Sequence, residues 1–333
     1  MKSLRTLKDW LRSRAHFLYG ALTLLPGFPR NLLWRHTGGS ISARYCYSVW
    51  MRHLVSINNL RSGVPKSIAE LGPGDSVGIG LAALLSGAER YVALDVVKYA
   101  DLSGSCELFE ELVMLFKERA AIPNQEEFPD IKPLLNDYSF PTSIITEEIL
   151  ADSLSESRLE MLRLGLRTGG DESCLSYAAP WFDANVMKSS SVDLIFSQAV
   201  MEHVDDIHQA YAFMYGWLTP NGLISHQVDF KSHRLTLRWD GVRALSNWQW
   251  QILRGKRPYL LNRVVCGGHL DAMLVNGFRL LQLIRFERHP EVSRENLAVE
   301  FFQISEADRR TAGAYFIAQK EPSISQMNAT QRH

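Results

Sequence analysis

Two acidic residues and a glycine-rich turn stand where a parallel sheet holds a cofactor. An apolar run over residues 67–71 contains Glu70 and leads into the turn Gly72-Pro73-Gly74. A second apolar run ends in Asp95, about twenty residues beyond the turn. Strands that end side by side in this way hold nucleotide-like cofactors across their carboxyl ends. Glycine permits positive φ and leaves room for the ligand, and Asp95 can accept hydrogen bonds from two ribose hydroxyls.

The residue types around this turn distinguish between two cofactors. A dinucleotide-binding turn carries a third glycine where this chain has Val77. Glu70 is unfavourable beside a pyrophosphate and favourable beside a cationic amino-acid group. The turn therefore favours a cofactor with a cationic amino-acid group over NAD, and a nicotinamide oxidoreductase is the weaker interpretation.

Three motifs in the same order resemble those of the class I S-adenosylmethionine-dependent methyltransferases. The first is the turn itself, E-x-G-x-G, with Ser76 where a third glycine is frequent. The second is D-L-I-F-S over residues 193–197, which leads into E-H-V over residues 202–204. The third is L-T-P-N-G over residues 218–222, which is similar to the turn before the family's fifth strand. The resemblance covers residues 64–320 apart from two insertions, and extends to small-molecule (type 11-like) methyltransferases, including those encoded with bacterial surface-polysaccharide genes.

The resemblance implies a cofactor site at the carboxyl ends of the strands. The amino-acid part of S-adenosylmethionine would contact the turn, and its ribose would contact Asp95. The adenine would lie near Trp181, for which a place in the core is an equal alternative. The expected cofactor residues are Glu70, Gly72, Pro73, Gly74, Asp95, Trp181, Ser197 and Gln198.

An alcohol acceptor is hardly ionised at neutral pH, so its methylation benefits from a general base. His203 is the first choice because it lies little more than one helical turn beyond Gln198. His226 is a second candidate, and Asp229 could orient a histidine or contact sugar hydroxyls. The alternative for Glu202 and His203 is a role in packing and hydrogen bonding.

The sequence predicts no metal site. Some O-methyltransferases of ubiquinone biosynthesis resemble this segment and bind a divalent ion through E-x-x-E-H. Here Ala199 replaces the leading acid and leaves A-V-M-E-H. Loss of a carboxylate weakens a site for a hard cation.

Alternating strands and helices predict a doubly wound, Rossmann-like α/β fold with a seven-stranded, mostly parallel sheet and an antiparallel last strand. The methyltransferase domain is expected over residues 37–320, with helical insertions at 101–173 and 231–263, and a disordered tail over 321–333. Both insertions leave the sheet where substrates bind, so we expect them to form a lid. The expected strands cover residues 67–71, 91–95, 175–179, 192–197, 222–228, 278–284 and 311–318.

Composition excludes several classes of protein. The chain has 36 basic and 36 acidic residues, so no overall field attracts nucleic acid. Its four cysteines form no C-x-x-C pair, which argues against a structural zinc site and favours a reducing cytoplasm. We therefore expect a cytoplasmic enzyme that takes a small-molecule or glycan acceptor.

The first 36 residues form a basic amphipathic segment, with seven bases and one acid. Its uncharged run over residues 17–25 is much shorter than the roughly 20 residues needed to span a bilayer. A helix of this kind either rests on a lipid surface, here the inner face of the membrane, or packs on the protein's own core. The sequence leaves both alternatives open.

The second insertion predicts the acceptor. Trp239, Trp248, Trp250 and Tyr259 are interleaved there with eight basic residues. Aromatic faces suit sugar rings, and arginines suit phosphate. The leading hypothesis is O-methylation of a sugar hydroxyl on a glycan or glycolipid precursor. The alternatives are methylation of a quinone or natural product, a non-catalytic methyltransferase-like module that binds a partner, and a surface loop without a ligand.

Overall fold

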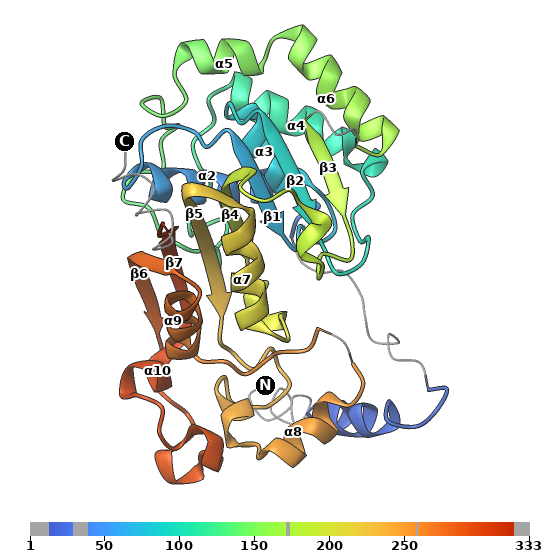
Figure 1. Ribbon diagram of the computed structural model, residues 1–333, viewed down its shortest axis with the longest axis vertical. Coiled ribbons are helices and arrows are strands. Elements are labelled where there is room, and N and C mark those ends of the chain that lie inside the picture. The colour runs from blue at the N-terminus through green and yellow to red at the C-terminus, as the bar shows by residue number, and fades with distance from the viewer. Residues whose placement is uncertain (1–12, 29–38, 171–173, 258, 323–333) are drawn as a thin grey trace, which may run out of the picture.

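A seven-stranded sheet forms the centre of the molecule (Figure 1). The computed structural model describes residues 13–28, 39–170, 174–257 and 259–322. The sheet order is β3-β2-β1-β4-β5-β7-β6, in which β7 runs antiparallel to both of its neighbours. The predicted fold is therefore confirmed. The strands are β1 (Ser67–Leu71), β2 (Arg90–Leu94), β3 (Leu175–Ala178), β4 (Val192–Gln198), β5 (Leu218–Asp229), β6 (Phe278–Glu287) and β7 (Thr311–Lys320).

Helices cover both faces of the sheet and give it two apolar cores. The first core lies against α2 (Ala43–Asn58), α3 (Gly78–Leu85), α4 (Cys106–Lys117), α5 (Glu147–Ser153) and α6 (Glu156–Thr168). The second lies against α7 (Ile207–Trp217) and α9 (Cys266–Val275). Two further α-helices are α8 (Asn247–Arg254) and α10 (Glu306–Arg310).

Helix α3 packs so closely on the sheet that it requires a glycine. A Cβ on Gly80 would lie 2.0 Å from the ring of Tyr91 on β2. The helix that follows the glycine-rich turn is thereby held against the strand that ends before Asp95. This contact fixes the two halves of the expected cofactor site relative to each other.

The first insertion is anchored by a buried arginine of α2. The guanidinium group of Arg52 is fully buried and donates hydrogen bonds to the carbonyl oxygens of Pro123, Ile131 and Pro133. These acceptors offset the large cost of removing the group from water. The insertion's helices α4 and α6 pack against each other and against α2, α3 and β3.

A lower lobe is built from three separate stretches, residues 13–28, 230–265 and 288–310 (Figure 1). The third stretch lies between β6 and β7 and was not predicted. Arg243 joins it to the second insertion by donating to the carbonyl oxygens of Asp308 and Thr311. Asn262 joins the lobe to the short 3₁₀ helix η3 (Met201–His203), because its side-chain amide donates to the carbonyls of Met201 and Val204.

The described part of the N-terminal segment packs on the protein itself. Residues 13–22 are helical and lie against α8, so close that a Cβ on Gly20 would lie 2.1 Å from the carbonyl oxygen of Leu253. The backbone N–H of Lys256 donates to Thr23 Oγ1 at 2.9 Å. Residues 1–12 and 29–36 of this segment, and the expected tail beyond residue 322, lie outside the described residues. Within the described ranges, every helix is too short or too polar to cross a membrane.

Candidate active site

A cavity of about 570 Å³ opens at the carboxyl ends of β1, β2, β3 and β4. Each of these strands ends in a loop that contributes to the cavity wall. Seven of the eight expected cofactor residues line it, and His203 does so as well. The lining residues among those expected are Glu70, Gly72, Pro73, Gly74, Asp95, Trp181, Gln198 and His203.

The glycine-rich turn requires its glycines. The backbone φ angles of Gly72 and Gly74 are +65° and +78°, which side-chain-bearing residues rarely adopt. A Cβ on Gly72 would also lie 2.7 Å from a methyl carbon of Val200. The turn is supported by Ser40, whose hydroxyl accepts hydrogen bonds from the backbone N–H groups of Asp75 and Ser76. Sequence analysis missed Ser40 because it lies far from the turn along the chain.

Asp95 presents an unused acceptor to the cavity. Its Oδ1 accepts a hydrogen bond from the N–H of Val96 at 2.7 Å. Its Oδ2 has no hydrogen-bond partner among the described residues, although the residue is only 5% exposed. Burial raises the pKa of this carboxyl to about 6. A ligand with two neighbouring hydroxyl groups, such as a ribose, would satisfy the free oxygen.

Glu70 lies at the opposite side of the turn and is almost completely buried. It accepts a hydrogen bond from the hydroxyl of Tyr91 at 2.6 Å. Burial raises the pKa of its carboxyl to about 8, and the hydrogen bond opposes that shift. A cationic group in the cavity would favour the ionised form. The two carboxylates thus match a ligand that combines an ammonium group with a ribose.

Aromatic side chains form the wall beyond Asp95. Trp181 lines the cavity and also packs edge-on against Trp217, so it serves both the site and the core. Its neighbour Phe182 is 43% exposed and stacks with Tyr259, with ring centroids 6.5 Å apart. This pair joins the end of β3 to the second insertion, and sequence analysis did not identify it.

Ser197 and Gln198 point to opposite faces of β4, as neighbours on a strand do. Gln198 lines the cavity, and its Oε1 lies 3.3 Å from His53 Nε2. Ser197 is fully buried, with its hydroxyl 2.7 Å from His226 Nδ1. His226 is also fully buried, with its ring near those of Tyr211 and Phe316. The expectation that Ser197 and His226 border the cavity is therefore corrected.

His203 is the histidine that reaches the cavity. It lies on η3, and its Nδ1 is 2.9 Å from the carbonyl oxygen of Tyr259. A carbonyl only accepts hydrogen bonds, so Nδ1 carries the proton and Nε2 carries the lone pair. Burial, aided by the nearby His233, lowers the pKa of His203 to about 4. The ring is thus neutral over the physiological range.

Asp229 lies behind the cavity wall. Its carboxylate is 3.4 Å from His233 Nε2 and 3.1 Å from Lys231 Nζ. It contacts neither His203 nor His226 through a hydrogen bond of the described residues. Asp229 therefore orients His233, which sequence analysis mentioned but did not select.

Comparisons with known proteins agree with this geometry. The model of a family described as "Methyltransferase domain" matches residues 159–225, which run from α6 through β3, β4 and α7 into β5. Over these residues the chain is similar to that methyltransferase family, and the match covers less than half of its length. No curated protein matches the chain.

Solved structures that resemble this fold are distant in sequence. An S-adenosylmethionine-dependent methyltransferase from Mesorhizobium loti is 12% identical, with 85% of this chain and 100% of that chain covered at a TM-score of 0.40. An S-adenosylmethionine-dependent methyltransferase from Methanosarcina mazei is 12% identical, with 80% and 97% covered at a TM-score of 0.42. At these values the likenesses support no conclusion about activity.

The residues that line the cavity fit S-adenosylmethionine. The free Oδ2 of Asp95 suits the ribose, and the buried carboxyl of Glu70 suits the ammonium group. A side chain at Gly72 would collide with Val200, which also lines the cavity. When bound, this cofactor supplies a methyl group on a sulfonium ion, which is its own leaving group.

The two insertions contribute unequally to the site. None of the described residues of the first insertion lines the cavity, so the expectation that it forms a lid is corrected. The second insertion contributes Tyr259. Trp239 and Trp250 are buried within the lower lobe, and Arg243 and Arg263 donate to backbone carbonyls there. These four aromatic and basic residues of the insertion are therefore structural.

Proposed function

We propose that this methyltransferase domain methylates a sugar hydroxyl on a glycan or glycolipid precursor, of the kind used for surface polysaccharides. The observation that carries the proposal is the composition of the wall opposite the glycine-rich turn. His203 and Asp205 supply polar groups there, and Phe182 and Tyr259 supply an aromatic pair. Aromatic faces beside hydrogen-bonding groups suit a sugar ring.

In the proposed reaction the acceptor oxygen forms a bond to the methyl carbon. The bond between that carbon and sulfur breaks, and the hydroxyl proton leaves to a base. Glu70 and Asp95 would hold the donor by its ammonium and ribose groups, beside the glycine-rich turn. Alignment of two reactants in this way supplies up to about 7–11 kcal/mol of barrier reduction.

Proton removal is assigned to the polar cluster around His203. The lone pair on Nε2 is the free acceptor of that ring, since Nδ1 donates to Tyr259. A positioned acid–base group contributes roughly 10²–10⁴-fold to such a reaction. His226 lacks access to the cavity and is not carried forward in this role.

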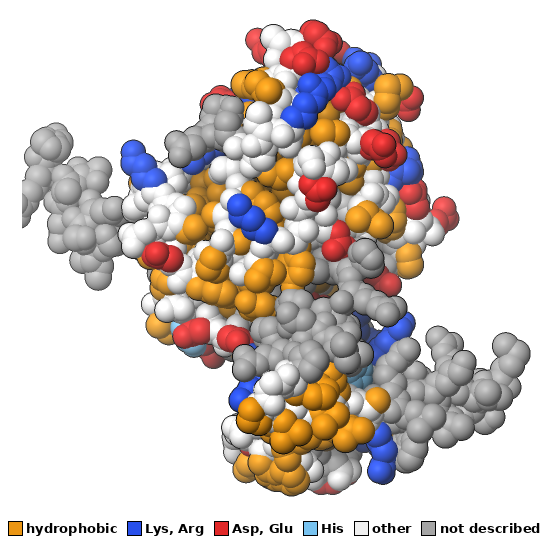
Figure 2. Space-filling model, turned by 90° about the vertical axis from the view of Figure 1, so that its right-hand side faces the viewer, with side chains coloured by type: hydrophobic (Ala, Val, Ile, Leu, Met, Phe, Trp, Pro, Cys, Tyr) orange, Lys and Arg blue, Asp and Glu red, His pale blue; other side chains and the backbone are white. Residues whose placement is uncertain are grey.

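A lipid-linked acceptor is supported by the exposed face of the lower lobe. Figure 2 shows hydrophobic side chains gathered on this lobe, which carries helix 13–22 and α8. Leu18, Leu24, Leu25 and Trp248 are exposed on these segments, with Leu18 and Trp248 more than 60% exposed. Arg14 and Lys256 are exposed close to them in sequence. Apolar and basic side chains together favour contact with an anionic lipid surface at the inner face of the membrane.

The function is tested by transfer of an isotope-labelled methyl group to cell-envelope extracts. The product should be a methyl ether on a sugar, identified by hydrolysis and mass spectrometry. Parallel reactions contain a quinone acceptor panel and a panel of small natural products. A labelled sugar supports the proposal. If a compound of another panel is labelled instead, that compound is the acceptor and the sugar proposal is refuted. Binding of S-adenosylhomocysteine without transfer to any acceptor would favour the non-catalytic module.

Lipid contact is tested separately with vesicles. The full chain should sediment with vesicles that contain anionic lipid and remain in solution with vesicles of neutral lipid. A variant with Leu18, Leu24 and Leu25 changed to Gln should lose this sedimentation, whereas Leu164→Gln, an exposed leucine of α6, should retain it. Equal sedimentation of both variants would assign the contact to another surface.

A further inference from the structure

Glu202 is a buried carboxylate whose two oxygens lack a partner. Its side chain is 3% exposed, and neither oxygen has a hydrogen-bond partner among the described residues. A buried carboxyl in this state costs free energy unless a hydrogen-bond donor, a cation or a metal satisfies it. A bound donor, cation or metal ion would therefore satisfy the Glu202 carboxylate.

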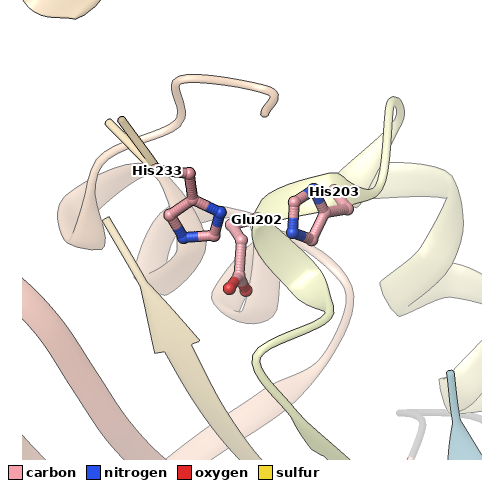
Figure 3. A group of neighbouring side chains, drawn as sticks. All are labelled: Glu202, His203 and His233. Atoms are coloured by element: carbon pink, nitrogen blue, oxygen red, sulfur yellow. The ribbon is translucent and has the colours of Figure 1, made fainter. Parts of the chain in front are cut away.

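Two imidazole rings flank this carboxylate (Figure 3). One ligand atom each from Glu202, His203 and His233 lies within 4.8 Å of the other two. The ring centroids of the two histidines are 5.3 Å apart. Three such atoms around one point have the spacing of a mononuclear metal site.

Both histidines are already oriented as metal ligands usually are. Such a histidine binds the metal through one nitrogen and donates its other N–H to a carbonyl or carboxylate. The Nδ1 of His203 lies 2.9 Å from the carbonyl oxygen of Tyr259, and the Nε2 of His233 lies 3.4 Å from the carboxylate of Asp229. The nitrogens left for a metal are Nε2 of His203 and Nδ1 of His233.

The backbone at His233 is held in an unusual conformation. The φ angles of His233 and Arg234 are +44° and +63°. Left-handed backbone is unfavourable for residues with side chains and is concentrated at functional sites. Here it turns the chain after β5 so that His233 faces η3.

We propose that Glu202, His203 and His233 bind a divalent transition-metal ion, with Zn²⁺ as the best match. Two imidazoles and one carboxylate form a ligand set that zinc sites use, whereas Mg²⁺ and Ca²⁺ prefer oxygen alone. Three protein ligands leave a fourth position open. Because His203 lines the cavity, that position is accessible from it. The absence of an acid at Ala199 does not prevent this site, since the third ligand comes from the loop after β5.

The role of the ion rests on the proposed function, although its binding does not. A metal at this point would contact the acceptor hydroxyl and lower its pKa. The hydroxyl proton would then leave to water, because the metal would occupy Nε2 of His203, the atom that would otherwise accept it. The sugar oxygen would be presented opposite the glycine-rich turn in either case.

The test measures metal binding without reference to activity. The full chain is treated with a chelator and titrated with Zn²⁺ by calorimetry, and Co²⁺ is used as a spectroscopic probe. We expect one equivalent of each ion to bind, with the visible absorption bands of four-coordinate Co²⁺. His233→Ala and Glu202→Gln should weaken Zn²⁺ binding by more than about tenfold. His208→Ala removes an exposed histidine of α7 and should leave it unchanged.

Folding of each variant is checked by circular dichroism and thermal unfolding before titration. The site is overturned if the natural chain binds no stoichiometric Zn²⁺, or if His208→Ala weakens binding as much as His233→Ala. Metal binding as expected with no methylated sugar would refute the proposed function and keep the site. Methylated sugar without metal binding would refute the site and leave His203 as the base.

Discussion

The two sides of the cavity are assembled in different ways. The cofactor side comes from two short segments, and the parallel pairing of Leu71 with Leu94 brings Gly72 next to Asp95. The acceptor side combines η3, the loop after β5 and a lower lobe whose parts lie far apart in the chain. The first side is therefore encoded in contiguous motifs. The second exists only once distant segments have met.

Replacing His203 should separate the two sides most clearly. We expect His203→Ala to lower kcat by roughly 10²–10⁴-fold, because the proton-accepting or metal-binding ring is lost. The affinity for S-adenosylhomocysteine should remain unchanged, since the ammonium and ribose contacts lie across the cavity. Single-turnover assays and calorimetry measure the two effects, with His208→Ala as the matched control. Parallel loss of binding and turnover would contradict the division into two sides.

Asp95→Ala should have the next largest effect and should act on the cofactor side alone. Loss of hydrogen bonds to a charged acceptor costs about 1–3 kcal/mol, which corresponds to roughly 5- to 150-fold weaker binding of S-adenosylhomocysteine. Calorimetry measures this change. Asp130→Ala, at an exposed carboxylate of the first insertion, should bind normally. Unchanged affinity in a folded Asp95 variant would remove this residue from the site.

Gly72→Ala should destabilise the fold as well as the site. The added Cβ meets Val200, and the positive φ is strained for alanine. We expect the free energy of unfolding to fall by about 1–3 kcal/mol, measured by urea denaturation. Gly165→Ala is the matched control, because nothing lies within 4 Å of an added Cβ in that helix. A stability loss of the same size at both positions would show that the turn has no special constraint.

The smallest expected effect is a pH dependence of cofactor binding. Burial raises the pKa of Glu70 to about 8 and that of Asp95 to about 6 in the free protein. Bound ammonium and hydroxyl donors favour the ionised forms, so protons are released on binding and affinity rises severalfold as pH increases from 6 to 8. The stability of the ligand-free protein changes in the opposite direction. Because both carboxyls hold their protons more tightly when folded, their contribution to the free energy of unfolding is complete at acidic pH and is lost as pH rises towards 8.

Calorimetry in two buffers of different ionisation enthalpy measures this proton release. Glu70→Gln should release fewer protons and flatten the profile above pH 6. A slope that persists unchanged in this variant would assign the titration to another group.

Sequence analysis predicted the fold and the cofactor side because both depend on local patterns. The apolar run over residues 67–71 is β1 itself, and the glycines follow directly. Strand β5 begins earlier than predicted, at Leu218, because Val192 pairs with Leu218 before the turn and Leu194 pairs with Leu223 after it. A sequence pattern does not show a shift of pairing of this kind.

The acceptor side was predicted only in part, for a physical reason. Neighbouring residues of a strand face opposite sides of the sheet. Which of the two faces the cavity depends on the helices that cover each side. His226 faces α7 and α9, and so it could not be excluded before those helices were placed. The pairing of His203 with His233 depends on a left-handed turn after β5, for which histidine and arginine give no local signal.

Asn262 links the lower lobe to the part of the cavity wall that His203 forms. Its side-chain amide donates hydrogen bonds to the carbonyls of Met201 and Val204, on either side of His203. Its backbone N–H donates to the carbonyl of Glu202 at 2.7 Å. The position of the His203 ring is therefore tied to the lower lobe, whereas the glycine-rich turn is held by Ser40 and β1. Asn262 thus makes the imidazole side of the cavity depend on segments that the turn does not need.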